Sequence, residues 1–417
     1  MSAPITMSRS SSRLRNIIFV APFPIDTTMR FVRAVRSLPD VRLLGIVHTP
    51  PKGKDARVYD DMVRITDPLS SRDILDATHV LKTRHGQPTR ILGILEALMV
   101  QLGEARAQFG VPGLGPDTAE LFRDKARMKN ALLQAGLPVA RSRLIHGAKD
   151  AEAFAEEVGF PMVLKPRDGA GAKATFRVRS KSNLLPAVKG MGASEASPIL
   201  AEEFLTGREF SFETVTLGGQ PRVDSISHYL PSCLEVLEND WMQWCCLLPR
   251  DIDGPEYAGA RKMGHAAVRA LGLDNGMTHM EWFQRPDGSL VIGEIAQRPP
   301  GANITRMTGL ANDIDPYRAW ARAVVDGELD APWDRKYAVG CAFLRGMGRG
   351  RVVGLSGVHE ASEIASRWTV EAKLPDIGAP KSDSYEGDGY VIVRDSSTEV
   401  VKKLLKRIIE TIKVHYA

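Results

Sequence analysis

The stretch MVLKPRDGAGAKATFRV, residues 162–178, decides the fold of this chain. An apolar run ends at Lys165, a glycine-rich loop follows, and the residues after the loop alternate between apolar and polar as a strand does. The lysine would supply a point charge, and Gly169 and Gly171 would let backbone N–H groups approach phosphate oxygens. The stretch therefore predicts two strands joined by a loop, with Lys173 inside it, that covers a polyphosphate.

Two familiar phosphate-binding patterns do not fit this loop. The Walker A spacing G-x4-G-K-[ST] is absent. A GxGxxA pattern begins at Gly169, but a Rossmann turn must open a helix, and the residues after this one alternate like a strand. A surface hairpin without any ligand is an equally good interpretation of the stretch taken alone.

The composition is that of a globular protein with more than one domain. Its 417 residues exceed one ordinary core, and 43% are hydrophobic and 25% charged. The net charge of +5 is spread along the chain, which argues against nucleic-acid binding. No apolar run approaches the roughly 20 residues of a membrane helix. We expect a cytoplasmic protein with no membrane partner, whose Ser/Arg-rich residues 1–15 form a disordered tail.

The cysteines indicate no redox or zinc site. Four cysteines without a CxxC pair make neither a disulfide framework nor a zinc ribbon. The adjacent Cys245 and Cys246 are interpreted as buried hydrophobic residues.

Residues 16–116 carry the pattern of alternating strands and helices. Strand-type runs at 16–23 and 41–49 enclose a helical stretch at 27–38, and a further helix is predicted over 93–109. This alternation predicts an α/β domain built on a small, doubly wound parallel sheet.

The remainder of the chain reads as α+β. A compact stretch at 139–205 contains the glycine loop, and the strands 278–284 and 289–296 are joined by the turn Pro286-Asp287-Gly288. A new β-rich unit begins at Tyr337, and the chain ends in an amphipathic helix over 398–414.

Two glutamates lie on the predicted hairpin of residues 278–296. Glu281 and Glu294 can face one another there and share a hard cation, and magnesium prefers carboxylates together with phosphates. Arg298 can clamp a substrate carboxylate and stabilise oxyanion charge. The alternatives are a polar sheet face and a surface arginine; His279 fits a packed core histidine as well as a ligand.

A third acidic group stands in AEEFLTGREFSFE, residues 201–213. Carboxylates such as Glu202 and Glu209 accept hydrogen bonds from adenine amino groups and ribose hydroxyls. A solvated edge with alternating charges is an equally good interpretation of this run alone.

The order and spacing of these motifs resemble the ATP-grasp superfamily. The resemblance rests on PGLGPDTAELFRDKARMKNALLQAGLPVA, MVLKPRDGAGAKAT, LAEEFLTGREFSFE and HMEWF…IGEIAQR, and it covers residues 16–417. Within the superfamily, the chain is similar to carboxylate–amine ligases with a biotin-carboxylase-like plan, including L-amino-acid (dipeptide) ligases and carnosine-synthase-type enzymes. It implies an ATP-grasp fold with an N-terminal domain (16–116), an ATP-grasp domain (117–330) with a mobile lid (139–205), and a β-rich C-terminal subdomain (331–417).

The resemblance also implies a role for each matching residue. Those implied to hold ATP through its phosphates, adenine or ribose are Lys125, Lys165, Gly169, Gly171, Lys173, Glu202, Glu203, Leu205 and Glu209. Within this set, Glu203 and Leu205 would act through their backbones.

The implied metal ligands are Glu281 and Glu294, for Mg²⁺ or alternatively Mn²⁺, and the implied catalytic residues are Arg298 and Lys165. The family often reads E-x-N-x-R where this chain has Ala296, so an asparagine ligand is missing. A water or Gln297 would take its place.

The implied reaction joins a small carboxylate to a small amine, both amino-acid-like in kind, through an acyl phosphate, with release of ADP and phosphate. Two alternatives stay open: a carboxylase that activates bicarbonate, and a non-catalytic nucleotide-binding scaffold. Residues 224–250 would cover the acceptor pocket, with His228, Trp241 and Trp244 shaping it; an ordinary packed segment is an equally good interpretation. A homodimer is one option for the assembly.

Overall fold

The computed structural model describes residues 14–169, 175–330 and 332–417, and the chain divides into two units, Met1–Pro116 and Asp117–Ala417. The predicted tail, residues 1–15, lies outside the described residues except for its last two. Arg15 of these two begins the first strand. Among the helices of the described ranges, none combines the length and the apolar character needed to cross a membrane.

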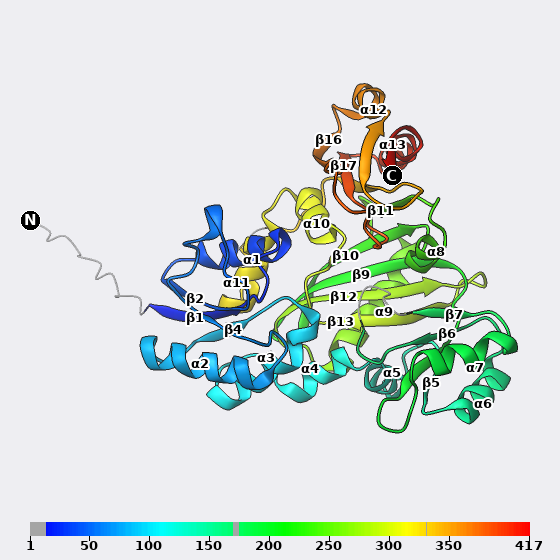
Figure 1. Ribbon diagram of the computed structural model, residues 1–417. Helices are drawn as coiled ribbons and strands as arrows, with labels where there is room; N and C mark the ends of the chain where they lie inside the picture. The colour runs from blue at the N-terminus through cyan, green and yellow to red at the C-terminus, as the bar shows by residue number, and fades with distance from the viewer. Residues whose placement is uncertain (1–13, 170–174, 331) are drawn as a thin grey trace, which may run out of the picture. The chain divides into compact units, whose positions relative to one another are not determined.

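The first unit is built on a parallel sheet, as predicted (Figure 1). Its four strands run in the order β3-β2-β1-β4, with every pair parallel. The strands are β1 (Arg15–Val20), β2 (Val41–Val47), β3 (Asp61–Arg64) and β4 (Arg90–Leu92); the helices are α1 (Asp26–Arg36), α2 (Ser71–His85) and α3 (Met99–Phe109). The apolar runs of β1 and β2 are buried because a parallel sheet is covered on both faces.

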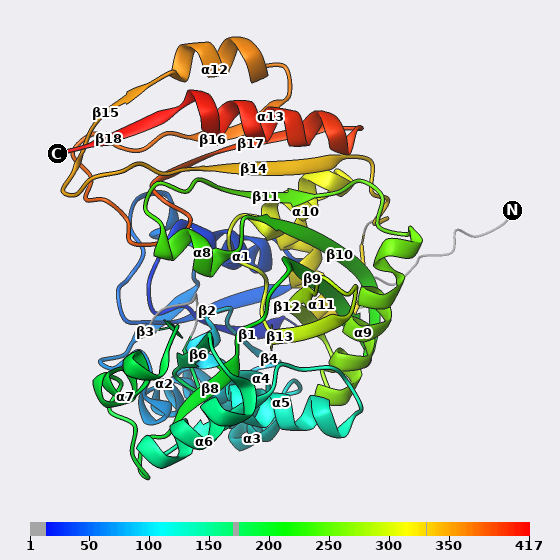
Figure 2. The same cartoon turned by 90° about the vertical axis from the view of Figure 1, so that its right-hand side faces the viewer.

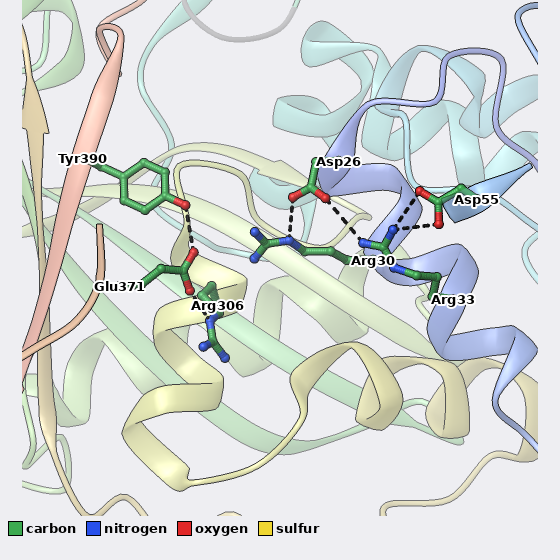
Figure 3. A network of polar contacts seen from close by, with 7 residues as sticks. All are labelled: Asp26, Arg30, Arg33, Asp55, Arg306, Glu371 and Tyr390. Carbon is green, nitrogen blue, oxygen red and sulfur yellow. Dashed lines mark hydrogen bonds and ion pairs between the residues drawn. The ribbon is translucent and has the colours of Figure 1, made fainter. Parts of the chain in front are cut away.

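The predicted helix over 93–109 was wrong at its start. Residues 90–92 pair with β1, and α3 begins only at Met99 after a short 3₁₀ turn. Its end is as predicted, because Gly110 takes the left-handed conformation that closes a helix. On α1, Arg33 pairs with Asp55 at 2.9 Å and Arg30 with Asp26 at 2.9 Å (Figure 3).

The second unit contains a four-stranded antiparallel sheet. We call this sheet and the two helices between its strands the small lobe. The strand order is β5-β8-β6-β7. The elements are β5 (Ser142–Ile145), α6 (Ala148–Val158), β6 (Met162–Lys165), β7 (Phe176–Val178), α7 (Lys181–Gly190) and β8 (Ile199–Glu203). The hairpin predicted from residues 162–178 is confirmed, since Met162 pairs with Val178. Gly171 and Lys173 lie outside the described residues.

An antiparallel sheet of eight strands forms the centre of the second unit, in the order β13-β12-β9-β10-β11-β14-β17-β16. The strands are β9 (Arg208–Leu217), β10 (Gln220–Leu230), β11 (Trp244–Leu248), β12 (Gly276–Gln284), β13 (Leu290–Ala296), β14 (Ala338–Leu344), β16 (Thr369–Lys373) and β17 (Gly389–Asp395). In Figure 1 the small lobe lies below the long strands of this sheet, at the lower right.

The helices of the second unit flank these two sheets. They are α4 (Pro116–Arg123), α5 (Lys125–Gln134), α8 (Cys233–Glu238), α9 (Pro255–Leu271), α10 (Ile304–Asn312), α11 (Pro316–Asp326), α12 (Val358–Ala365) and α13 (Thr398–Thr411). Figure 2 shows α13 lying along β14 and β17. Glu371 of β16 accepts from Arg306 of α10 and from Tyr390 of β17, each over 2.8 Å, so this helix is tied to the sheet edge (Figure 3).

The C-terminal helix ends earlier than predicted. Residues 413–416 form strand β18, which pairs with β15 (Val352–Ser356), so Val414 is in a strand. Pairing with a distant segment outweighs the helical pattern of the last residues, because backbone hydrogen bonds to β15 satisfy groups that a frayed helix end would leave open.

Candidate functional site

Glu281 and Glu294 stand opposite each other on adjacent antiparallel strands. The register pairs Glu281 of β12 with Glu294 of β13, next to a bulge. The turn between the strands closes as predicted, with Arg285 donating to Ser289 and Gly288 at a φ of 84°. Directly opposed residues share a sheet face, with Cβ atoms about 5 Å apart. The sequence therefore placed these two carboxylates correctly relative to one another.

Lys125 reaches this pair from the first turn of α5. Its Nζ lies 3.0 Å from Glu294 Oε1 and donates to the carbonyl of Gly169 over 2.5 Å. Asp124 caps the helix by accepting from two backbone N–H groups, and it also accepts from Arg167 over 2.6 Å. The cap thus fixes the start of α5 against the segment that follows β6.

A buried cluster of two lysines and one glutamate adjoins the pair. Glu202 of β8 lies 3.0 Å from Lys165 Nζ and 3.2 Å from Lys129 Nζ. Burial alone would raise the pKa of Glu202, but the two lysines hold it below the usual range. For Lys165, burial is outweighed by Glu202 and Glu294, so the pKa is raised. For Lys129, burial prevails and the pKa is lowered.

Lys129 is a site residue that the sequence analysis missed. Its side chain is only 3% exposed, and Nζ also donates to the carbonyl of Gly293 over 2.8 Å. The signal was present in RDKARMK, because residues four apart on a helix share a face. A lysine one turn after Lys125 had to point in the same direction.

The neighbouring acids on β8 separate to opposite faces, as alternation requires. Glu202 turns toward the lysines, whereas Glu203 accepts from Arg141 and from Arg285 over 3.0 Å. Leu205 follows β8 on the connection to β9. The carboxylate of Glu203 is therefore engaged in ion pairs on the other face, and its backbone N–H donates to the carbonyl of Arg141 over 2.9 Å.

Glu209 is the second residue of β9 and is buried beside Glu281. Its Oε2 accepts from the backbone N–H of Cys233, the first residue of α8, over 3.0 Å. Burial and the charge of Glu281 raise the pKa of Glu209 to about 8. A protonated carboxyl at neutral pH can donate as well as accept a hydrogen bond.

His279 is buried behind Glu281 and bonded to a third acid. Its Nδ1 lies 2.9 Å from Glu213 Oε1, and its Nε2 lies 3.3 Å from the Tyr229 hydroxyl and 3.8 Å from Glu281 Oε1. Burial would lower the pKa of His279, but the hydrogen bond to Glu213 and the nearby carboxylate of Glu281 raise it to about 9. This histidine thus lies between two carboxylates, which favour its protonated form.

Ala296 lies directly opposite His279 on β13. The side-chain amide of Gln297 lies close to Gly276, at the start of β12, and not beside the carboxylate pair. Arg298 follows β13, donates to the carbonyl of Pro299, and lowers the pKa of Glu281 together with His279 and Lys165, against the effect of burial.

The carboxylate pair fits a magnesium ion that is bound mainly through a substrate. Within the described ranges, no three His, Cys, Asp or Glu side chains gather closely enough to enclose a metal. Magnesium usually keeps waters and takes one or two carboxylates together with phosphates. Glu294 already accepts a cation, Lys125, so its carboxylate is directed into the site.

The segment 224–250 holds only part of what was predicted for it. His228 lies on the face of β10 opposite to that of Tyr229, hydrogen-bonded to Tyr257 and packed on Phe210. Burial lowers the pKa of His228 to about 4. Trp244 is fully buried against Phe343, whereas Trp241 is 63% exposed. His228 and Trp244 are therefore packing residues of the sheet.

Comparisons with known proteins agree with this geometry. Residues 130–307 match the ATP-grasp domain model. The chain is 28% identical over 254 residues to the L-arginine-specific L-amino acid ligase of Bacillus subtilis, covering 60% of each chain. It is 25% identical over 256 residues to D-alanine–D-alanine ligase of Neisseria meningitidis, covering 60% of this chain and 78% of that ligase.

A solved structure extends the likeness to nearly the whole chain. The L-amino acid ligase of Bacillus licheniformis superposes with a TM-score of 0.78 and 18% identity, over 98% of this chain and 100% of that one. At this identity the likeness concerns the fold. The matched domain, the order of the motifs and the lysine–carboxylate site agree: residues 130–307 of this chain form an ATP-grasp domain.

Proposed function

We propose that this chain is an ATP-dependent carboxylate–amine ligase that forms an amide or peptide bond and releases ADP and phosphate. The observation that carries the proposal is the convergence of Lys125, Lys129 and Lys165 on Glu202 and Glu294, beside Glu281. Three lysines close to these carboxylates suit the binding of a polyphosphate together with its metal ion. The relatives named as amino acid ligases support substrates of that kind.

In the proposed reaction, a substrate carboxylate oxygen attacks the γ-phosphorus of ATP, the bond to the β–γ bridging oxygen breaks, and ADP leaves. An amine then attacks the acyl phosphate carbon and displaces phosphate, and the nitrogen loses a proton. Magnesium, held by Glu281 and Glu294, would neutralise charge on the phosphates. The lysines orient the phosphates, and Arg298 stabilises the oxyanion of the tetrahedral intermediate.

Closure of the small lobe would protect the acyl phosphate from water. The small lobe carries Lys165 and Glu202, so its closure would bring them over the nucleotide. Glu209 at the start of β9 would bond the ribose, in keeping with its buried position.

The test is a screen of amino-acid pairs and small acids with ATP and Mg²⁺, following phosphate release and product mass. We expect a product with the mass of the amide, and one phosphate released for each product molecule. Glu294→Gln should lower turnover by about 100-fold or more, since one lost electrostatic contact in a transition state costs about 3–4 kcal/mol. Near-normal turnover of this variant would overturn the metal assignment.

The same screen separates the alternatives. A carboxylase would release phosphate only with bicarbonate and would incorporate it into an acceptor. A scaffold would bind nucleotide without amino-acid-stimulated hydrolysis under any condition of the screen.

A further inference from the structure

The small lobe is joined to helix α8 of the large sheet at a single carboxylate. Arg177 Nε lies 3.1 Å from Glu238 Oε1, and Arg179 Nη2 donates to Glu238 Oε2 over 2.8 Å. Arg177 is in β7 and Arg179 follows it, whereas Glu238 ends α8, which lies between β10 and β11. Two cations of the small lobe therefore converge on one anion of the large-sheet module.

Arg177 also contacts the connection on which the small lobe would turn. Its guanidinium lies 4.1 Å from the ring centroid of Phe204, which follows β8 and precedes β9. The side chain of Arg177 is 14% exposed and that of Glu238 24%, so water screens this pair less than a surface pair. One arginine thus contacts both the connection and α8.

The other end of α8 is attached to the nucleotide side of the site. Cys233 N–H donates to Glu209 over 3.0 Å, and Ser232 caps the helix. Helix α8 is therefore held at its start by the acid proposed to bond the ribose and at its end by the small lobe. A movement of the small lobe away from the sheet would break the second attachment.

We propose that Glu238 is a positioning residue that holds the small lobe closed against α8 and so slows the escape of bound nucleotide. Glu238 pairs with neither Lys125, Lys129 nor Lys165 in the described contacts; it acts through Arg177 and Arg179. The ion pairs link closure of the small lobe to the segment 224–250, which α8 interrupts. This inference concerns nucleotide retention and does not depend on which bond the enzyme forms.

The experiment measures dissociation of a fluorescent ADP analogue, mant-ADP, with Mg²⁺ by stopped flow. Glu238→Gln should accelerate dissociation about three- to fivefold, the range of a partly shielded ion pair, and Arg179→Gln, whose side chain is 63% exposed, by a smaller factor. The double variant should dissociate no faster than Glu238→Gln, because both changes break the same contact. The matched control is Glu157→Gln, which breaks a pair with Arg143 inside the small lobe and should leave the rate unchanged.

A second readout needs no nucleotide. Hydrogen–deuterium exchange of the α8 amides should be faster in Glu238→Gln than in the control. An unchanged dissociation rate with unchanged exchange would overturn the inference, as would a double variant whose effect is the product of the single effects. A wild-type chain that retains mant-ADP and forms no amide would overturn the ligase proposal alone.

Discussion

Replacing Glu202 by glutamine should destabilise the second unit strongly, although the two side chains have nearly the same shape. Glu202 lies between Lys129 and Lys165, at 3.2 and 3.0 Å, and only 8% of its side chain is exposed. Removing one partner of a buried pair leaves a charge without compensation and costs about 3–5 kcal/mol. Here two lysines lose their anion, so we expect the upper part of that range.

The assay is thermal unfolding of wild type and Glu202→Gln without nucleotide. For a unit of this size, each kcal/mol shifts the melting temperature by about 2 °C, so a fall of roughly 8–10 °C is expected. The control Glu157→Gln breaks an exposed pair with Arg143 and should cost less than about 1 kcal/mol. If Glu202→Gln melts within a degree of the control, the buried charges do not stabilise the fold in the way argued.

The same difference should depend on pH in a defined direction. The pKa of Glu202 is lower in the folded chain than the ordinary 4.5, so its contribution is present above pH 4.5. It is lost as the pH falls through the depressed folded pKa. A gap between wild type and Glu202→Gln that widened on acidification would contradict the pairing.

Three further predictions concern buried titrating groups. Glu209→Gln should match the stability of wild type near pH 5 and exceed it at pH 9. The reason is that the pKa of Glu209 is raised to about 8, so the wild-type protein loses stability as the pH rises through that value. Urea unfolding at both pH values checks this, and a constant difference in stability would contradict it. His279→Gln should lower the free energy of unfolding by about 3 kcal/mol at pH 6, where the histidine, with a folded pKa of about 9, contributes fully. The loss should shrink as the pH rises through 9. Urea unfolding across this pH range checks it, and a pH-independent loss would exclude the charged pair with Glu213. Burial raises the pKa of all four thiols, those of Cys233, Cys245, Cys246 and Cys341. They should therefore resist Ellman's reagent at pH 8 until the protein is denatured. Fast labelling of the native protein would refute this.

Several features could be predicted from the sequence because they depend on short-range geometry. The hairpin of residues 162–178 followed from alternation around glycines, and the facing of Glu281 and Glu294 followed from the period of two and the Pro-Asp-Gly turn. The parallel sheet of the first unit followed from buried apolar runs separated by helices. Errors fell at the ends of elements: α3 begins only after a 3₁₀ turn, and α13 ends where β18 pairs with β15.

The sequence by itself thus determined the resemblance to ATP-grasp proteins, the strands that carry the carboxylates, and the residue types of the site. Only the tertiary structure decided which charges meet. Lys129 contacts Gly293 across 164 positions of sequence, and His279 bonds Glu213 across 66. Such contacts follow from how α5 and the two sheets pack, and packing is a property of side-chain volumes in three dimensions that no local pattern specifies.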